Sequence, residues 1–473
     1  MTPLTELLDL ANERLGGCVL AANDDFFAEK ENLVKTVDAV FVSGKYTDRG
    51  KWMDGWESRR KRVPGHDWAV LRLGVPGVIR GVVVDTSFFT GNYPEQCSIE
   101  GCEAAGDAQA GDLTGWTELL PKVALRGDTK NVFETPSARR FTHLRLNIFP
   151  DGGVARLRAH GIALPDFRPG GEIDLAAAAC GGVVVDASDR HYGHPENLIL
   201  PGRAANMGDG WETRRRRGPG HDWVILRLAA EGVIERVEVD TSHFKGNYPD
   251  ACRLEISARE NADSWTDLLP RTKLNGDSRH VFAVSASARL VRFNIFPDGG
   301  VSRLRVYGTL TECGRIETRL ARFNASGSES AAAELLRCCG SPSWAGRMAD
   351  SRPFASLADM EEAADRVWSE CAPEDWLAAF AAHPRIGQQS AGKWSQEEQS
   401  RAGEVPAELA ERNREYREKF GYIFIVCATG KSAPEMLDLL KQRLKNDPAD
   451  EIRNAAGQQR AITRLRLRKL LTE

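Results

Sequence analysis

A stretch that combines cationic, acidic and histidine side chains occurs twice in the chain. The first copy reads DGWESRRKRVPGHDW from Asp54 to Trp68, and the second reads DGWETRRRRGPGHDW from Asp209 to Trp223. An arginine can bind a carboxylate through two parallel hydrogen bonds, and a histidine or a carboxylate can move protons. We therefore predict that this stretch binds an anionic substrate and assists acid–base chemistry. The candidate residues kept in both copies are Glu57, Arg59, His66, Asp67, Glu212, Arg214, His221 and Asp222.

The histidine of this stretch is the one that both copies keep. The chain has nine histidines, and aligning the copies places His66 opposite His221, whereas His143, for example, faces Leu290. Packing or surface ion pairs would explain any single kept residue. A nuclear localisation signal would not explain a basic run in the same position of a second folded copy. We therefore favour a functional interpretation of the motif as a whole.

A second candidate site lies nearer the C-terminus, where AAHPRIGQ contains His383 and the motif SQEEQ follows from Ser395 to Gln399. A proline disfavours helix for the residue before it, so Pro384 predicts that His383 lies at a helix end. Ser395 and Glu398 have the spacing of a helix capping box. The same helix start would expose N–H groups that can bind a polar ligand. The spacing fits both interpretations equally.

The elements that must position the first motif belong to a duplicated all-β domain. The motif DTSFFTGNYP at Asp85 recurs as DTSHFKGNYP at Asp240, with the same offset of 155 that separates Asp54 from Asp209. Short β-branched stretches such as DWAVLRL and HLRLNIF are bounded by turn signals, and PDGG predicts a hairpin. We expect two tandem jelly rolls, over residues 1–165 and 170–312. The closing stretch RLRVYG resembles that of galactose-binding-like domains.

The pattern changes after Cys313. A polar linker is expected over 313–325, followed by an all-α domain over 326–473 that contains the amphipathic stretch PEDWLAAFAAH and the C-terminal EIRNAAGQQRAITRLRLRKLL. A capping box is predicted at Ser356 and another at Ser432. The apolar GYIFIVCATG fits either a buried helix turn or an extended segment.

Composition excludes several classes of protein. The 473 residues carry a net charge of −4, which gives no general attraction to nucleic acid or to an anionic membrane. The N-terminus lacks the pattern of a secretory signal, and no apolar run approaches the roughly 18 residues that span a bilayer. The ten cysteines form no CxxC pair. We therefore expect reduced thiols and a cytoplasmic protein.

The duplicated motifs resemble those of one family. KYTDRGKWMDGWESRRKRVPGHDW, DTSFFTGNYP and NIFPDGG are similar to allantoicase, and the resemblance covers about residues 1–312. It implies two jelly-roll repeats that hydrolyse allantoate to ureidoglycolate and urea. Arginines would clamp the substrate carboxylate, and a histidine or carboxylate would move protons as urea leaves. No tight cluster of histidines and acids decides whether a divalent metal takes part, and the working copy is also left open.

The C-terminal motifs resemble those of a second family. CCGSPSWAGRM, SRPFASLADM, AAHPRIG, SxxEQ, NREYREKFGYIFIVCATGKSAPEML and ITRLRLRKLL are similar to 2-oxo-4-hydroxy-4-carboxy-5-ureidoimidazoline (OHCU) decarboxylase, over about 320–473. The resemblance implies an all-α fold, no cofactor, and His383 and Glu398 as the catalytic pair. Implied substrate-binding residues are Pro384, Ser395, Gln399, the backbone of Phe424, Ile425, Val426, Cys427 and Ala428, and an arginine assigned to Arg466, with Arg464 fitting the spacing as well.

The implied decarboxylation is chemically consistent with the absence of a cofactor motif. In OHCU the departing carboxylate leaves a carbon next to a ring C=N bond, which can accept the electron pair, so neither pyridoxal nor thiamine is required. His383 would manage the hydroxyl proton. Glu398 would polarise the substrate and control the face that is reprotonated, giving (S)-allantoin.

The whole chain is therefore interpreted as a two-activity enzyme of urate breakdown, an amidine hydrolase joined to a carboxy-lyase. Its partners would be the small-molecule ureido substrates allantoate and OHCU. One alternative is a tandem jelly-roll ligand-binding protein in which only one enzyme domain, or none, is active. Another is an active allantoicase with the helical domain as a scaffold. The oligomeric state stays open, a homo-oligomer included.

Overall fold

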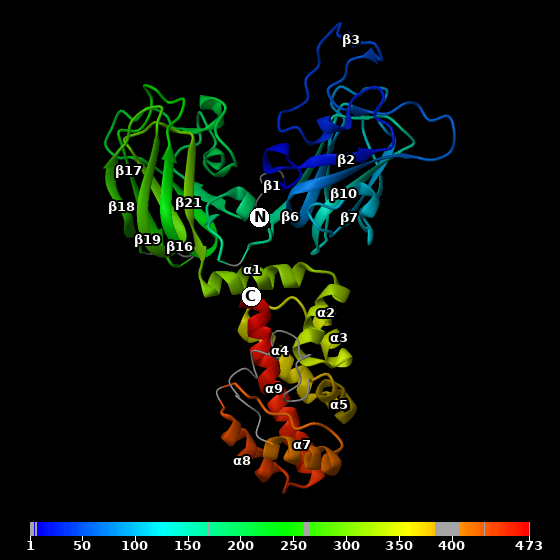
Figure 1. Ribbon diagram of the computed structural model, residues 1–473. Coiled ribbons are helices and arrows are strands. Elements are labelled where there is room, and N and C mark those ends of the chain that lie inside the picture. Colours follow the sequence, from blue (N-terminus) through cyan, green and yellow to red (C-terminus); the bar gives the residue numbers. More distant parts are fainter. Residues whose placement is uncertain are drawn as a thin grey trace. The chain divides into compact units, whose positions relative to one another are not determined.

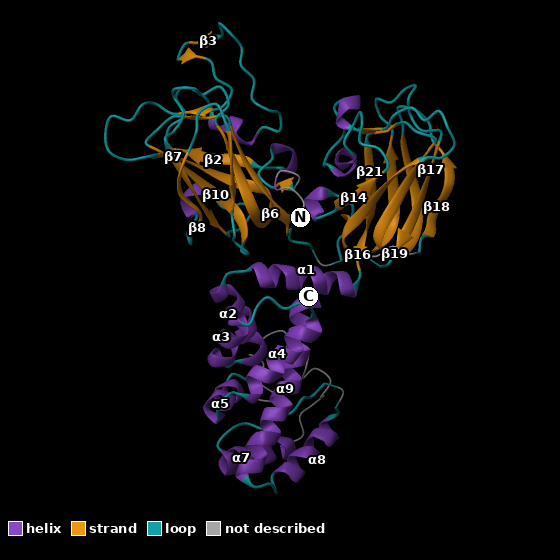
Figure 2. Cartoon of the chain, turned by 180° about the vertical axis from the view of Figure 1, so that it is seen from behind, coloured by secondary structure: helices purple, strands orange, loops and turns teal. Residues whose placement is uncertain are grey.

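The computed structural model describes residue 4 and residues 7–168, 170–259, 264–383, 407–429 and 431–472. The chain divides into two compact units, Met1–Gly314 and Arg315–Glu473. The first unit is built of strands and contains two similar β-sheet bodies, and the second is built of helices (Figure 1, Figure 2). The predicted order of two all-β copies and one all-α domain is confirmed.

The first β copy is organised around β6 (Asp67–Asp85), a strand long enough to take part in both layers of a sandwich. Its first half pairs with β2 and β10, and its second half pairs with β9 and β12. Beyond β10 the sheet continues through β7 to β8, and beyond β12 it ends at β1. The bounds are β1 Leu8–Asp9, β2 Cys18–Ala22, β7 Gln96–Cys102, β8 Thr117–Ala124, β9 Lys130–Glu134, β10 Arg140–Phe149 and β12 Arg156–Ala163.

The second copy repeats this topology around β16 (Asp222–Asp240). The strand order β13-β21-β16-β19-β17-β18 matches β1-β12-β6-β10-β7-β8 of the first copy. Leu, Ile and Val side chains that alternate along the central strands fill a separate core in each copy. The bounds are β13 Ile173–Asp174, β14 Val183–Ala187, β17 Ala251–Ser257, β18 Thr266–Lys273, β19 Arg279–Phe296 and β21 Arg303–Leu310.

The predicted PDGG hairpin is wrong. Strands β10 and β12 both pair with β6 and not with each other, and β11 (Gly153–Val154) between them pairs with β5 (Trp56–Glu57). A Cβ on Gly153 would lie 1.9 Å from the ring of Phe89. The glycine is therefore required because the chain passes tightly over an aromatic ring on its way between the two layers. Gly300 has the same relation to Phe244 in the second copy, at 2.0 Å.

The segment expected as a linker is a helix. Residues Glu312–Ala325 form α1, and Leu320 and Phe323 are buried in the core of the helical unit. Ile316, Leu320 and Phe323 lie at helical spacing, so one apolar face of this otherwise polar segment packs inward. The other helices are α2 Ser328–Cys339, α3 Pro342–Asp350, α4 Leu357–Ser369, α5 Pro373–Ala381, α7 Ala407–Phe420, α8 Ala433–Arg443 and α9 Pro448–Thr472.

The predicted capping box at Ser432 is complete, whereas at Ser356 only the serine half is present, because the Asp359 carboxylate accepts from the Ala355 N–H and not from that of Ser356. The Ser356 hydroxyl accepts a hydrogen bond from the Asp359 N–H at the start of α4, and Ser432 caps α8 together with Glu435. Of the two interpretations of GYIFIVCATG, the extended one is confirmed for residues 423–428, which form neither helix nor strand. No helix among the described residues combines the length and apolar character needed to cross a membrane.

Candidate active sites

The ends of the duplicated basic stretch have structural roles. The Trp56 side chain is fully buried, and its ring N–H donates to the Asp24 carbonyl oxygen at 2.8 Å. The Asp54 carboxylate accepts from Nη2 of the buried Arg156 at 2.8 Å. In the second copy Trp211 and the pair Asp209–Arg303 repeat these contacts, and Asp209 accepts at 3.1 Å.

Two of the four contiguous cations in each copy are held by acids of their own repeat. Arg59 Nε donates to Asp24 at 2.7 Å, and Lys61 forms an ion pair with the buried Asp67. Arg214 and Arg216 make the same two pairs with Asp189 and Asp222 in the second copy. The basic run therefore braces the loop that leads into the central strand. This arrangement gives Arg59 and Asp67 structural partners.

Glu57 lies away from these pairs, where Asn92 donates to its carboxylate at 2.7 Å. Burial raises the pKa of Glu57, and the hydrogen bond from Asn92 opposes that shift. Glu212 and Asn247 form the matching contact at 2.6 Å in the second copy.

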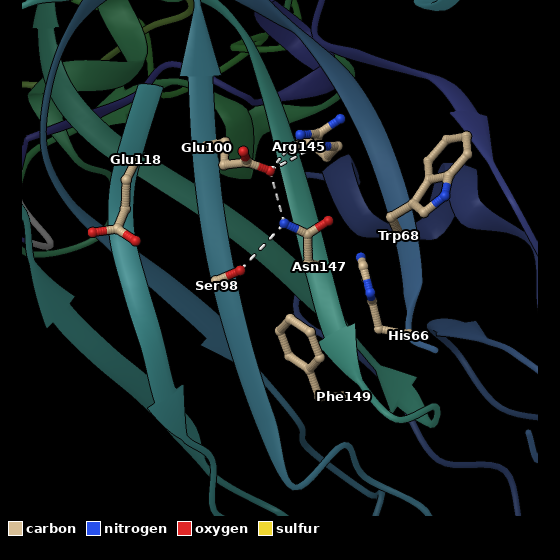
Figure 3. A pocket seen from close by; sticks show the side chains of 8 residues that line it. All are labelled: His66, Trp68, Ser98, Glu100, Glu118, Arg145, Asn147 and Phe149. Carbon is tan, nitrogen blue, oxygen red and sulfur yellow. Dashed lines mark hydrogen bonds and ion pairs between the residues drawn. The ribbon is translucent and has the colours of Figure 1, made fainter. Parts of the chain in front are cut away.

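A polar hollow of about 450 Å³ opens on the sheet of the first copy, and His66 is the one candidate of the basic stretch that reaches it (Figure 3). Four neighbouring strands, β8, β7, β10 and β6, and the loop residue His66 just before β6 supply its lining. Cross-strand register places Ser98 beside Asn147, and Glu100 beside both Arg145 and Glu118. The lining residues are His66, Trp68, Ser98, Glu100, Glu118, Arg145, Asn147 and Phe149.

Glu100 is the centre of the hydrogen-bond network in this hollow. It accepts from Nε and Nη2 of Arg145 at 2.8 and 2.6 Å, and from the Asn147 amide at 3.0 Å. Asn147 also donates to the Ser98 hydroxyl at 3.2 Å. Figure 3 shows Glu118 and His66 on opposite sides of the Ser98–Asn147 pair. The hollow thus offers carboxylate acceptors and cationic or amide donors on one surface.

Aromatic rings line the edges of the hollow and contact its imidazole and its cations. The His66 ring lies 4.8 Å from the ring of Phe149, and Lys122 Nζ lies 3.9 Å from the centre of the same ring. The Arg145 guanidinium lies 4.7 Å from the Trp116 ring. These contacts orient the cations without neutralising their charge.

Sequence reasoning missed most of this lining. Glu100, Arg145 and Asn147 recur as Glu255, Arg292 and Asn294 in the second copy. The comparison between copies that singled out the histidine would have found them had it been applied to every polar residue.

Within the described part of the chain, no group of three or more His, Cys, Asp or Glu residues is arranged to hold a metal ion.

His383 follows α5 in the helical unit, in agreement with the expected helix end. Its Nε2 donates to Oε1 of Gln459 on α9 at 2.6 Å. Gln459 is fully buried, and its amide nitrogen donates to Thr463 Oγ1 at 3.2 Å and to the Cys339 carbonyl at 3.4 Å. These donors orient the amide so that its oxygen faces the imidazole. The contact therefore places the proton of a neutral His383 on Nε2 and leaves Nδ1 as the basic nitrogen.

Gln458, the residue before Gln459, contacts the backbone segment 424–428 that is predicted to bind substrate. Gln458 Oε1 accepts from the backbone N–H of Cys427 at 3.0 Å, and Arg443 donates to the Ile425 carbonyl at 2.7 Å. One turn of α9 thus contacts both His383 and the backbone of 424–428. Pro384, Ser395, Glu398 and Gln399 lie outside the described residues.

The geometry of α9 distinguishes the two arginines that the spacing left open. Arg466 is buried and lies seven residues after Gln459, and therefore on the same helix face. Arg464 is exposed and pairs with Asp365 through Nε at 3.2 Å and through Nη2. The face shared with Gln459 favours Arg466 as the substrate-binding arginine.

Exchanging each of these arginines gives a direct test. We expect Arg466→Lys to raise the KM for OHCU at least tenfold, because an ammonium cannot replace a two-pronged guanidinium contact. Arg464→Ala should leave KM and kcat within about twofold, since it removes only an exposed ion pair. Steady-state decarboxylation kinetics on both variants, with circular dichroism to verify helix content, make the measurement. An equal loss in both variants would contradict the assignment.

The fold and the two sites define a chain with two separate catalytic domains, one of duplicated β-sandwiches and one of helices. Residues 8–164 and 173–311 match the family model of the allantoicase repeat, and residues 324–468 match that of OHCU decarboxylase. The chain belongs to the allantoicase family and carries an OHCU decarboxylase domain at its C-terminal end.

Similar proteins support the assignment of the β unit. A probable allantoicase of Pseudomonas aeruginosa (strain UCBPP-PA14) is 50% identical over 323 residues, which cover 65% of this chain and 97% of that protein. Probable allantoicase 1 of Burkholderia mallei (strain ATCC 23344) is 50% identical over 319 residues, covering 64% and 94%. The crystal structure of allantoicase from Saccharomyces cerevisiae aligns with a TM-score of 0.54 at 35% identity, over 64% of this chain and 94% of that one.

Proposed function

We propose that the β unit hydrolyses allantoate to (S)-ureidoglycolate and urea, and that the helical unit decarboxylates OHCU to (S)-allantoin. The observation that carries this proposal is the match of the two family models, in sequence, over nearly the whole chain. The two reactions are related, because allantoin becomes allantoate after one ring-opening hydrolysis. A glycan-binding protein without activity is not favoured.

The hollow of the first copy has the groups that allantoate hydrolysis needs. Allantoate presents one carboxylate and two ureido groups, so it needs cations for its anionic end and acceptors for its N–H groups. Arg145 and Lys122 supply the cations, and Glu118 and Glu100 supply the acceptors. In the reaction the bond from the central carbon to one ureido nitrogen breaks, a water oxygen bonds to that carbon, and a proton goes to the departing urea. His66 lies where it can transfer that proton.

In the helical unit, we assign proton transfer to His383. Gln459 fixes its ring, Arg466 lies on the same face of α9 two turns further on, and the backbone of 424–428 contacts the neighbouring Gln458. Loss of CO2 leaves an electron pair that the C=N bond of the substrate accepts, His383 takes the hydroxyl proton of OHCU, and a proton added to the former C=N carbon gives (S)-allantoin. We propose that no cofactor takes part, because the substrate itself supplies the electron sink. Glu398 remains the expected partner of His383.

Assays on the full chain test the two activities separately. Urea release from allantoate measures the first, and formation of (S)-allantoin from freshly made OHCU, followed by circular dichroism, measures the second. The urea assay is repeated after dialysis against EDTA and with divalent metal ions added back, to establish the metal requirement. Binding of a sugar without urea release would contradict the first proposal, and an OHCU decay rate equal to that in buffer would contradict the second.

We also propose a cytoplasmic location. None of the ten cysteines forms a disulfide in the structure, and burial raises the pKa of Cys97 and Cys252 to about 12, which keeps both protonated and unreactive. A reducing compartment suits a protein with ten cysteines and no disulfide bond among them.

A further inference from the structure

We propose that allantoate binds in the hollow of the first copy alone, and that Arg253 closes the matching surface of the second copy. This inference rests on the proposed allantoate hydrolysis and adds to it the place of the site. It also assigns to one residue, Arg253, the difference in allantoate binding between the two similar domains.

The two surfaces are built from matching positions. The cross-strand register that pairs Ser98 with Asn147 also pairs Arg253 with Asn294, and Glu255 lies beside Asp267 as Glu100 lies beside Glu118. Six of the eight lining residues of the hollow are identical in the second copy, and only Ser98 and Glu118 differ, as Arg253 and Asp267. The identical residues are His221, Trp223, Glu255, Arg292, Asn294 and Phe296.

In the second copy the polar groups of this surface bind each other. Arg253 Nε donates to Asp267 at 2.6 Å, and its Nη2 lies 3.1 Å from Glu255 Oε1. His221 Nε2 lies 3.0 Å from Oδ1 of Asn294, whose amide nitrogen donates to Glu255 at 3.0 Å. The long arginine side chain therefore lies across the surface and pairs with both acids, so it competes with an incoming ureido group for these acceptors.

In the first copy the same network is incomplete. Ser98 has a short side chain and cannot reach Glu118. Within the described part of the chain, the Glu118 side chain forms no ion pair or hydrogen bond, and the His66 side chain forms no hydrogen bond. These groups lie on opposite sides of the hollow in Figure 3. A carboxylate and an imidazole that face a hollow and form no side-chain hydrogen bond among the described residues are available for a ligand, and a volume of about 450 Å³ suits a small molecule.

The charge of the first surface also fits the ligand. Arg145 is matched by Glu100, whereas Lys122 at the Phe149 edge provides a cation and Glu118 at the opposite edge provides an anion. Allantoate has the complementary polarity, with a carboxylate at its centre and neutral ureido N–H groups at its ends. On the second surface, Arg253 adds a cation next to Glu255 and Asp267, the two carboxylates that would otherwise accept from a ureido N–H.

Reciprocal substitutions in the full chain test the proposal. Ser98→Arg should lower kcat/KM for urea release at least tenfold, and decarboxylation by the same sample should be unchanged. Arg253→Ser should leave urea release within about twofold of the unsubstituted chain. Glu118→Gln and Asp267→Asn form a second matched pair at exposed positions, where folding is not at risk: the first should lower urea release at least tenfold and the second should not.

The outcomes separate this inference from the proposed function. If the unsubstituted chain releases no urea, the proposed function fails. If it releases urea but Ser98→Arg and Glu118→Gln are as active as the unsubstituted chain, the function stands and the place of the site is wrong. A loss of urea release in Arg253→Ser or Asp267→Asn, with circular dichroism unchanged, would also overturn the proposal, because it would place the working site in the second copy.

Discussion

His383→Ala is expected to lower the rate of OHCU decarboxylation by roughly 10²–10⁴, the usual contribution of a positioned acid–base group, and to leave urea release from allantoate unchanged. The imidazole is held by Gln459, which is itself fixed by Thr463 and by the Cys339 carbonyl. Alanine removes the only group of this cluster that can exchange a proton near neutral pH. Because the substitution replaces a half-buried side chain at a helix end, the fold should survive.

The measurement compares both activities in the same sample. The appearance of (S)-allantoin is followed by circular dichroism, and urea release serves as the internal control for concentration and folding. Gln459→Met provides a second variant, because it keeps the imidazole and the volume but removes the acceptor. It should lower kcat less than His383→Ala and shift the pH profile of kcat, which a purely structural role would not do. Undiminished decarboxylation by His383→Ala with intact helix content would refute the assignment.

Arg156→Met is expected to destabilise the first β copy by about 3–5 kcal/mol, the typical cost of removing one partner from a buried ion pair. Arg156 is fully buried and donates to the Asp54 carboxylate at 2.8 Å, to the Asp54 carbonyl at 3.0 Å and to the Val37 carbonyl at 2.9 Å. Methionine fills much of the same space but removes these donors, and the Asp54 carboxylate then retains the Val40 N–H at 3.0 Å and Lys35 at 3.8 Å. Arg303→Met in the second copy should cost less, because Asp209 also pairs with Arg14.

Thermal and urea unfolding, followed in the full chain by circular dichroism, would measure this difference. Burial alone would raise the pKa of Asp54, but the hydrogen bonds from Arg156 and the Val40 N–H and the charges of Arg156 and Lys35 together outweigh it and lower the pKa below its ordinary value. A carboxyl group with a lowered folded pKa contributes stability above its unfolded pKa of about 3.9, and that contribution is lost as the pH falls through the folded value. The destabilisation by Arg156→Met should therefore shrink on acidification below about pH 4. A destabilisation that stays constant between neutral and acidic pH would contradict this account.

Many features of the two units could be read from local patterns. The duplicated motifs predicted two β copies, and the helical spacing beyond residue 326 predicted the all-α unit, because strand and helix formation depend on neighbours a few residues away. The same reasoning failed for 313–325. The polar composition of that segment suggested a linker, but Leu320 and Phe323 bury one face of α1 in a core formed by residues far along the chain.

The sequence by itself determined the class of fold, the two families, and the prominence of His66 and His383. Only the tertiary structure decided which side chains meet. Glu118, Ser98, Asn147 and Trp68 lie on four strands whose order does not follow the chain, and His66 directly precedes one of them, so their proximity depends on strand pairing and register. The packing of α5 against α9 likewise brings Gln459 to His383 and buries Arg466 while Arg464 faces outward. The difference between the β copies is a consequence of the same pairing. Ser98 leaves the first surface open, whereas Arg253 reaches the carboxylates of Asp267 and Glu255 and closes the second.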